Sequence, residues 1–150
     1  MVNHDDAEND DRGGMGTALA RAEAAVAALA RDYLVWARAD LALCQQYLAA
    51  AESDPTQRQQ HIAALFGIAH NIKGQGSSFG YPLMTRLGQS LCRLTKLPRS
   101  FSQSDLRLMD IHLQVMSEII QQEAIGEGTP DLRANVLQIE TLIEALSAAA

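Results

Sequence analysis

Apolar residues recur at three- and four-residue steps along most of this chain, and proline or glycine interrupts the pattern at four places. Steps of three and four place side chains on one face of an α-helix, whereas a half-buried strand needs strict alternation. The interruptions are Asp54-Pro55, Gly80 to Pro82, Leu97-Pro98 and the segment from Gly126 to Pro130. The pattern therefore predicts an all-α chain, and its short loops favour antiparallel neighbouring helices.

The interruptions divide the chain into helices expected over residues 17–51, 56–79, 82–96 and 102–124, and a last helix that begins at Pro130. Thr17, Ser102 and Thr129 are the expected N-caps, because a hydroxyl accepts a hydrogen bond from a free N–H of the first turn. Asp105 completes a capping box with Ser102. The sequence leaves open whether residues 17–51 form one helix or two.

The first 16 residues differ in composition from the rest. They are acidic, rich in glycine and without apolar periodicity, so we expect a disordered tail ahead of a single domain of residues 17–150. Cys44 and Cys92 are isolated in helical patterns, and there is neither a signal peptide nor an apolar run long enough to span a membrane. We expect a cytoplasmic protein with two reduced thiols and no membrane contact.

Charge is distributed unevenly. The net charge of −6 argues against nucleic acid as a partner, because nucleic-acid binding needs a basic surface. Between Pro55 and Ser104, however, there is no Asp or Glu, and six basic residues give this segment +6: Arg58, Lys73, Arg86, Arg93, Lys96 and Arg99. The middle of the chain is therefore suited to an acidic partner or a phosphoryl group.

His70 lies in this basic segment. On a helical wheel the stripe that should face the core consists of Ile62, Leu65, Ala69, Ile72, Gly76 and Phe79. His70 lies about 130° from the centre of that stripe, so we expect its imidazole to face water. Its neighbours one and two turns away are the small residues Gly67, Gly74 and Ser77, together with Phe66 and Lys73. Another protein can therefore approach the ring closely.

This arrangement suits phosphoryl transfer. A neutral imidazole, with an ordinary pKa of about 6.5, is a good nucleophile near pH 7. The transferred group needs positive charge on its equatorial oxygens, and Lys73 can supply it one turn from His70. The chain has no glycine-rich nucleotide loop and no convincing metal-ligand spacing. We therefore expect no cofactor and no ATP site of the chain's own, and the resemblance described next implies a phosphocarrier rather than an enzyme.

The string from Ala69 to Gly80, AHNIKGQGSSFG, closely resembles the signature of histidine phosphotransfer (HPt) domains. In this resemblance His70 is the phosphoacceptor, Ile72 the buried aliphatic residue, Lys73 the conserved cation and Gly74 the docking glycine. The match extends into the next helix through Leu83, Leu87, Gly88 and Leu91, and it is similar to the phosphotransfer domains of chemotaxis-type kinases.

The resemblance implies an antiparallel four-helix bundle, here with an additional N-terminal helix or helical extension. It also implies that His70 receives the phosphoryl group from a receiver-domain aspartate or a histidine kinase, and passes it to another receiver aspartate. The receiver domain of the response regulator would contribute the Mg²⁺. In this interpretation Phe66, Gly67, Gly74 and Ser77 face the receiver, while Arg86 and Arg93 add positive potential.

The chain departs from the family at one position. Many members carry Glu or Gln on the third helix to orient the imidazole, and the expected position holds Cys92. Gln89, one turn earlier, is the candidate substitute. Two other functions stay open: an HPt-like adaptor that binds a kinase or receiver without carrying phosphate, and a structural module that oligomerises through the alanine-rich residues 18–30.

Overall fold

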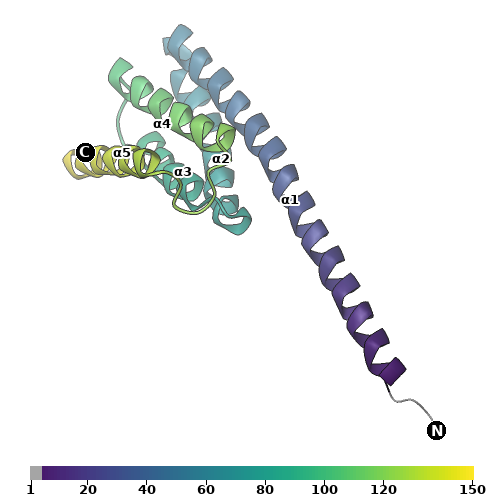
Figure 1. The fold of residues 1–150 in the computed structure, drawn as a ribbon. Helices are drawn as coiled ribbons and strands as arrows, with labels where there is room; N and C mark the ends of the chain where they lie inside the picture. Colours follow the sequence, from purple (N-terminus) through teal and green to yellow (C-terminus); the bar gives the residue numbers. More distant parts are fainter. Residues whose placement is uncertain (1–4) are drawn as a thin grey trace. The chain divides into compact units, whose positions relative to one another are not determined.

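The computed structural model describes the backbone of residues 5–150 and the side chains of residues 14–150. Within that range it contains helices and no strand, which confirms the all-α prediction (Figure 1). The α-helices are α1 (Asp5–Ser53), α2 (Arg58–Gln75), α3 (Pro82–Thr95), α4 (Gln103–Gln121) and α5 (Pro130–Ala149), and the short 3-10 helices are η1 (Pro55–Gln57) and η2 (Ser77–Phe79). No helix of the described residues is long and apolar enough to cross a membrane.

Residues 17–51, which the sequence assigned to one helix or two, belong to the single continuous helix α1. The helix begins at Asp5, so residues 5–16 are helical where the sequence analysis expected a disordered tail, and residues 1–4 lie outside the described range. Adding residues to an existing helix costs less than starting a new one, which favours extension from the alanine-rich segment.

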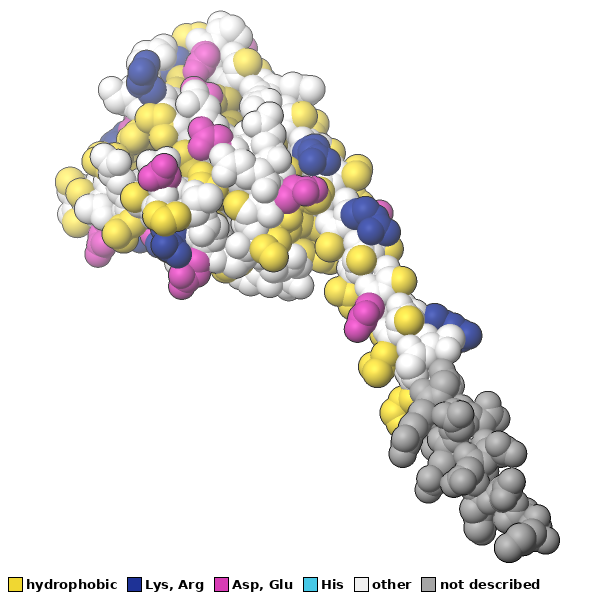
Figure 2. Space-filling view, viewed as in Figure 1, with side chains coloured by type: hydrophobic (Ala, Val, Ile, Leu, Met, Phe, Trp, Pro, Cys, Tyr) yellow, Lys and Arg dark blue, Asp and Glu magenta, His cyan; other side chains and the backbone are white. Residues whose placement is uncertain are grey.

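The chain divides into two compact units, residues 1–34 and residues 35–150. The boundary lies at Leu34, whereas composition suggested a boundary after residue 16. The side chains described in the first unit include several large apolar ones that remain on the surface, among them Met15, Leu19 and Val26. Figure 2 shows apolar side chains along this stretch of α1.

The second unit is a helical bundle with α3 at its centre, since α3 packs against α2, α4 and α5 (Figure 1). Leu87, Leu91 and Leu94 of α3 are completely buried, and burial of each such side chain stabilises the fold by about 1.5–3 kcal/mol. From the final part of α1, one face is buried at steps of four and three: Ala37, Leu41, Cys44, Leu48 and Ala51. The predicted helical bundle is therefore confirmed.

Local signals set the starts of α4 and α5 as the sequence indicated, whereas Thr17, the expected N-cap of the first helix, lies inside α1. Ser102 and Asp105 form the predicted capping box at the start of α4. The Thr129 hydroxyl accepts a hydrogen bond from the backbone N–H of Leu132, and Pro130 takes the first position of α5. These groups satisfy N–H donors that a helix start leaves without an internal partner.

The end of α2 differs from the prediction. The helix was expected to reach Phe79 but stops at Gln75, and η2 follows. A Cβ atom on Gly76 would lie 2.8 Å from the Tyr81 carbonyl oxygen, so this glycine allows the start of α3 to approach the end of α2 closely. Phe79, expected in the core stripe, is half-buried, and its ring meets that of Trp36 edge-on at 6.0 Å.

His112, in the middle of α4, is completely buried. Its Nδ1 lies 2.7 Å from the Leu108 carbonyl oxygen and its Nε2 lies 2.9 Å from the Ser90 hydroxyl. A carbonyl only accepts hydrogen bonds, so Nδ1 carries the proton and Nε2 accepts from Ser90. The neutral ring thus joins α4 to α3 inside the core, and burial lowers its pKa below the ordinary 6.5.

Candidate functional site

The exposed face of α2 carries His70. On the opposite face Ile62, Leu65, Ala69 and Ile72 are buried, as the helical wheel predicted. The His70 ring lies beside the Phe66 ring, with 6.0 Å between their centroids. None of the hydrogen bonds found among residues 14–150 involves the His70 ring, so the described part of the chain leaves both ring nitrogens available.

Two glycines keep the space around His70 open. Gly67 and Gly74 are exposed, and a Cβ atom added at either would meet no other atom within 4 Å. Since glycine inside a helix costs about 0.5–1 kcal/mol relative to alanine, this open space comes at the expense of helix stability. The geometry agrees with the clearance that the sequence predicted at these two positions.

Ser77 is placed differently from the prediction. It was expected two turns beyond His70 on the same helix, but α2 ends at Gln75 and Ser77 begins η2. Its backbone N–H donates to Thr85 Oγ1 at 2.8 Å, and its hydroxyl is 3.0 Å from the same atom. Ser77 therefore joins the end of α2 to α3, and only its exposed surface is available to a partner.

Two contacts fix the alignment of α3 along α2. A Cβ atom on Gly88 would lie 2.7 Å from the Lys73 backbone nitrogen, so Gly88 abuts Lys73. Near the other end, Lys96 Nζ lies 4.2 Å from the centre of the Phe66 ring. The two helices run in opposite directions and have the same rise per residue. Moving back three residues along α2, from Lys73 to His70, therefore corresponds to moving forward three to four residues along α3, from Gly88 to about Cys92.

Counted along this alignment, the level of His70 falls at residues 91–92 of α3, nearer to Cys92 than to Gln89. Cys92 is half-buried, and burial raises the pKa of its thiol while the positive charges of Lys73 and Lys96 oppose the rise. Gln89 is exposed and lines a groove between α3 and α5. Neighbouring residues of a helix point about 100° apart, so Gln89 lies on a different face from Gly88.

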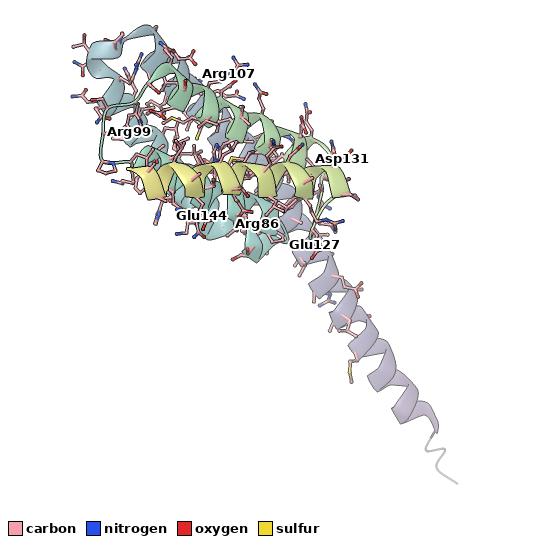
Figure 3. The ribbon with its side chains drawn as sticks, turned by 90° about the vertical axis from the view of Figure 1, so that its left-hand side faces the viewer. Arg86, Arg99, Arg107, Glu127, Asp131 and Glu144 are labelled. Atoms are coloured by element: carbon pink, nitrogen blue, oxygen red, sulfur yellow. The ribbon has the colours of Figure 1, made fainter. Side chains whose placement is uncertain are left out.

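The two arginines proposed to add positive potential line the same groove. Arg86 is bound to Glu140 of α5 through both Nε, at 3.2 Å, and a terminal nitrogen. This hydrogen bonding raises the pKa of Arg86. Figure 3 shows Arg86 beside α5. Arg93 is exposed, two turns after Arg86 along α3. The charge of Arg86 is therefore paired, and it holds α3 against α5.

Other basic residues of the acid-free segment are also held by the fold. Arg58 donates to the carbonyl oxygens of Ala51 and Phe101. Arg99 forms a two-pronged ion pair with the buried carboxylate of Asp105, one arm at 3.1 Å. Lys73 and Lys96, whose positive charges both act on Cys92, have no such ion pair among the described residues.

The sequence analysis counted Lys96 as part of the basic segment but did not select it as a site residue. Lys96 lies 26 residues after His70, and only the pairing of α2 with α3 brings it to Phe66. The signal available in the sequence was the short connection between two helices, which implies an antiparallel pair whose alignment can be counted.

The described residues contain no group of three or more His, Cys, Asp or Glu side chains that could hold a metal ion. A family model described as Hpt domain matches residues 28–149. The chain belongs to the Hpt domain family. Hpt domains act in phosphotransfer in two-component signalling, as phosphocarriers rather than enzymes. Neither a curated protein nor a solved structure matches the chain.

Proposed function

We propose that this Hpt domain carries a phosphoryl group on His70, received from a receiver-domain aspartate or a histidine kinase and passed to a receiver aspartate. The observation that carries the proposal is the exposed imidazole on α2, with open space at Gly67 and Gly74 on either side of it. A docked receiver needs that space to bring an aspartyl phosphate in line with a ring nitrogen.

In the transfer step a lone pair of the neutral ring attacks the phosphorus of the aspartyl phosphate. The P–N bond forms as the P–O bond breaks, and the aspartate leaves as a carboxylate. The other ring nitrogen keeps its proton. The negative charge on the three equatorial oxygens requires compensation, which Lys73 provides one turn away on α2. The Mg²⁺ of the reaction belongs to the receiver, and this chain needs no cofactor.

Lys96 is a second source of positive charge in this proposal. Its ammonium group lies over the Phe66 ring, and that ring is the neighbour of His70. An ammonium held over an aromatic face is attracted to it by about 0.5–1 kcal/mol at an exposed site. Phe66 therefore both offers an apolar surface to the receiver and keeps Lys96 close to the phosphoryl group.

The remaining predicted site residues have smaller parts in the proposal. Ser77 and Arg93 are exposed and would lie at the margin of a docked receiver, whereas Arg86 acts within the fold through its ion pair with Glu140. Cys92 takes the place opposite His70 that was assigned to Gln89. A thiol is a weak hydrogen-bond donor and acceptor, so it orients the ring less firmly than an amide would.

Transfer of labelled phosphate tests the proposal. Wild type, His70→Gln and His61→Gln are incubated with a panel of phosphorylated receiver domains and autophosphorylated histidine kinases. His61 is the control, because it is a second histidine of the same helix and is half-buried, whereas His70 is exposed. Wild type and His61→Gln are expected to acquire acid-labile, base-stable label, and His70→Gln none, with equal helix content in all three.

Label on His70→Gln would refute the assignment of the phosphoacceptor. A wild-type chain that binds receivers or kinases but takes no label from any donor would refute phosphate transfer and favour the adaptor function.

A further inference from the structure

The exposed apolar side chains of the first unit follow a strict pattern. Between residues 14 and 30 the large apolar residues are Met15, Leu19, Val26 and Leu29, which are 63%, 61%, 66% and 49% exposed. They are separated by steps of four, seven and three, and Ala22 fills the intermediate position. This is the a/d spacing of a coiled coil, with residues 19 and 26 at a, and residues 15, 22 and 29 at d. We call these five residues the N-terminal seam.

Charged residues avoid the seam. Arg21 and Glu23 take the c and e positions, and Arg31 and Asp32 take f and g. The side of the helix away from the seam carries alanines, including Ala24 at f. Apolar and charged residues are thus sorted by helix face, which simple alanine-rich helix propensity does not require. Figure 2 shows apolar side chains together with separate charged ones on this described stretch of α1.

The seam lies almost wholly outside the shared family domain. The Hpt domain match begins at residue 28, so of the five seam residues only Leu29 falls within it. Neither the proposed transfer chemistry nor the core of the second unit uses these side chains. A 3.5-residue repeat fits into the grooves of another α-helix that has the same repeat. A second copy of this chain supplies such a helix with an identical seam.

Charge favours a second copy over a lipid surface and indicates its direction. Residues 14–34 carry two Arg, one Glu and one Asp, so they lack the excess of basic residues typical of helices that lie on membranes. Along α1, residues 5–16 hold five acidic residues and one Arg, a sum of −4, whereas residues 17–38 sum to +1. A parallel pair would bring the two acidic segments together, and an antiparallel pair separates them.

We propose that the N-terminal seam forms an antiparallel coiled coil between two copies of this chain. The association goes beyond phosphotransfer and does not depend on it. Since the exposed seam spans only about two heptads and sustained coiled coils use three or more, the dimer is expected to dissociate on dilution. Each dimer then presents two Hpt domains, and a partner with two receivers would bind them with the advantage of linked sites.

Sedimentation velocity of the full chain over a range of concentrations tests the association. Wild type is expected to shift from monomer to dimer as concentration rises. Val26→Glu places a charge in the seam and is expected to stay monomeric, whereas the matched control Ala24→Glu places the same charge on the opposite side and keeps the dimer. Circular dichroism and the labelling assay are expected to be equal for all three, which separates this proposal from that of His70.

A wild type that stays monomeric throughout the range would overturn the proposal, as would equal effects of the two Glu variants. Wild type that instead binds vesicles of anionic lipid would assign the seam to a membrane.

Oxidative cross-linking tests the direction. In an antiparallel pair an a position faces a d position, so Val26→Cys is expected to cross-link to Ala22→Cys or Met15→Cys chains and not to itself. Self-cross-linking of Val26→Cys above the wild-type background would show a parallel pair and overturn the antiparallel arrangement.

Discussion

Gly88 is where α3 touches the backbone of α2, and its replacement by alanine measures how much the fold depends on that approach. An added Cβ would lie 2.7 Å from the Lys73 nitrogen and 2.9 Å from its Cα. Ordinary contacts of this kind are about 3.5–4 Å, so the helices must separate by most of an ångström. The obstructing atoms are backbone, which no change of rotamer can move. Overpacking of this kind costs about 1–3 kcal/mol.

A matched substitution on the neighbouring helix isolates the steric effect. Gly67 lies within α2, and an added Cβ there meets nothing within 4 Å. Gly67→Ala keeps the gain in helix propensity of about 0.5–1 kcal/mol without the clash. Gly88→Ala has the same gain in helix propensity, but this gain offsets only part of the cost of overpacking against Lys73. We expect Gly67→Ala to raise the free energy of unfolding by about 0.5–1 kcal/mol and Gly88→Ala to lower it by about 1–2 kcal/mol.

Urea unfolding followed by circular dichroism provides both values. The urea concentration at the midpoint of unfolding is expected to rise for Gly67→Ala and to fall for Gly88→Ala. The slope of the free energy of unfolding against urea concentration should stay the same. If Gly88→Ala were as stable as Gly67→Ala, Gly88 would not abut Lys73. The alignment that brings Cys92 level with His70 would then lose one of its two supports.

Four further outcomes follow from the described contacts. Gly74→Gln fills the space beside His70 and should slow labelling by a receiver by about tenfold or more, equivalent to about 1.4 kcal/mol, while the urea midpoint holds or rises. Lys96→Gln should slow labelling and lower the free energy of unfolding by no more than about 0.5–1 kcal/mol, the value of its contact with the Phe66 ring. Burial lowers the pKa of His112, so as pH falls the histidine of the unfolded chain is protonated before that of the folded chain. The contribution of this residue to the free energy of unfolding is therefore full above about pH 6.5 and should fall as pH decreases toward the folded pKa. A urea midpoint that stays constant from about pH 7 to about pH 5 would contradict this. Asp105→Asn weakens the pair with Arg99 and should cost about 1–3 kcal/mol by urea unfolding.

The helices were predictable because their signals are local. Proline, glycine and capping residues mark helix ends within a few positions, as Ser102, Asp105 and Thr129 show. The end of α2 was not predictable in this way. Gly76 continues the helical pattern in sequence, and it is the approach of Tyr81 and Thr85 from the start of α3 that accompanies the change to η2.

His112 shows a similar limit for the core. His112 lies three residues after Met109 and four before Met116, so the helical period places it on the same face as these two buried residues. Burial of an imidazole also requires partners for both nitrogens, and one of them, Ser90, comes from another helix. A sequence does not reveal that pairing, so the burial of this polar side chain was not predictable from the sequence.

In the candidate site, the placement of the residues on α2 was predictable from the sequence and that of the residues on α3 was not. The exposure of His70 and the position of Lys73 depend on one helix, so the 3.6-residue period suffices. The choice between Gln89 and Cys92 depends on how α3 is rotated and aligned along α2. The contacts of Gly88 with Lys73 and of Lys96 with Phe66 set that alignment, and neither is a local property.

The thiol at position 92 has an electrostatic consequence for the site. Lys73 and Lys96 both act on it, so a carboxylate at this position would attract the two ammonium groups and offset their charge. Burial raises the pKa of Cys92 and keeps the thiol neutral near pH 7, which leaves both lysines free of an acidic neighbour on this segment. The absence of Asp and Glu from residues 55–104 has the same effect. In the proposed transfer, a thiol would therefore orient the imidazole less firmly than an amide, while the two lysines would act on the phosphoryl oxygens, where charge compensation is needed.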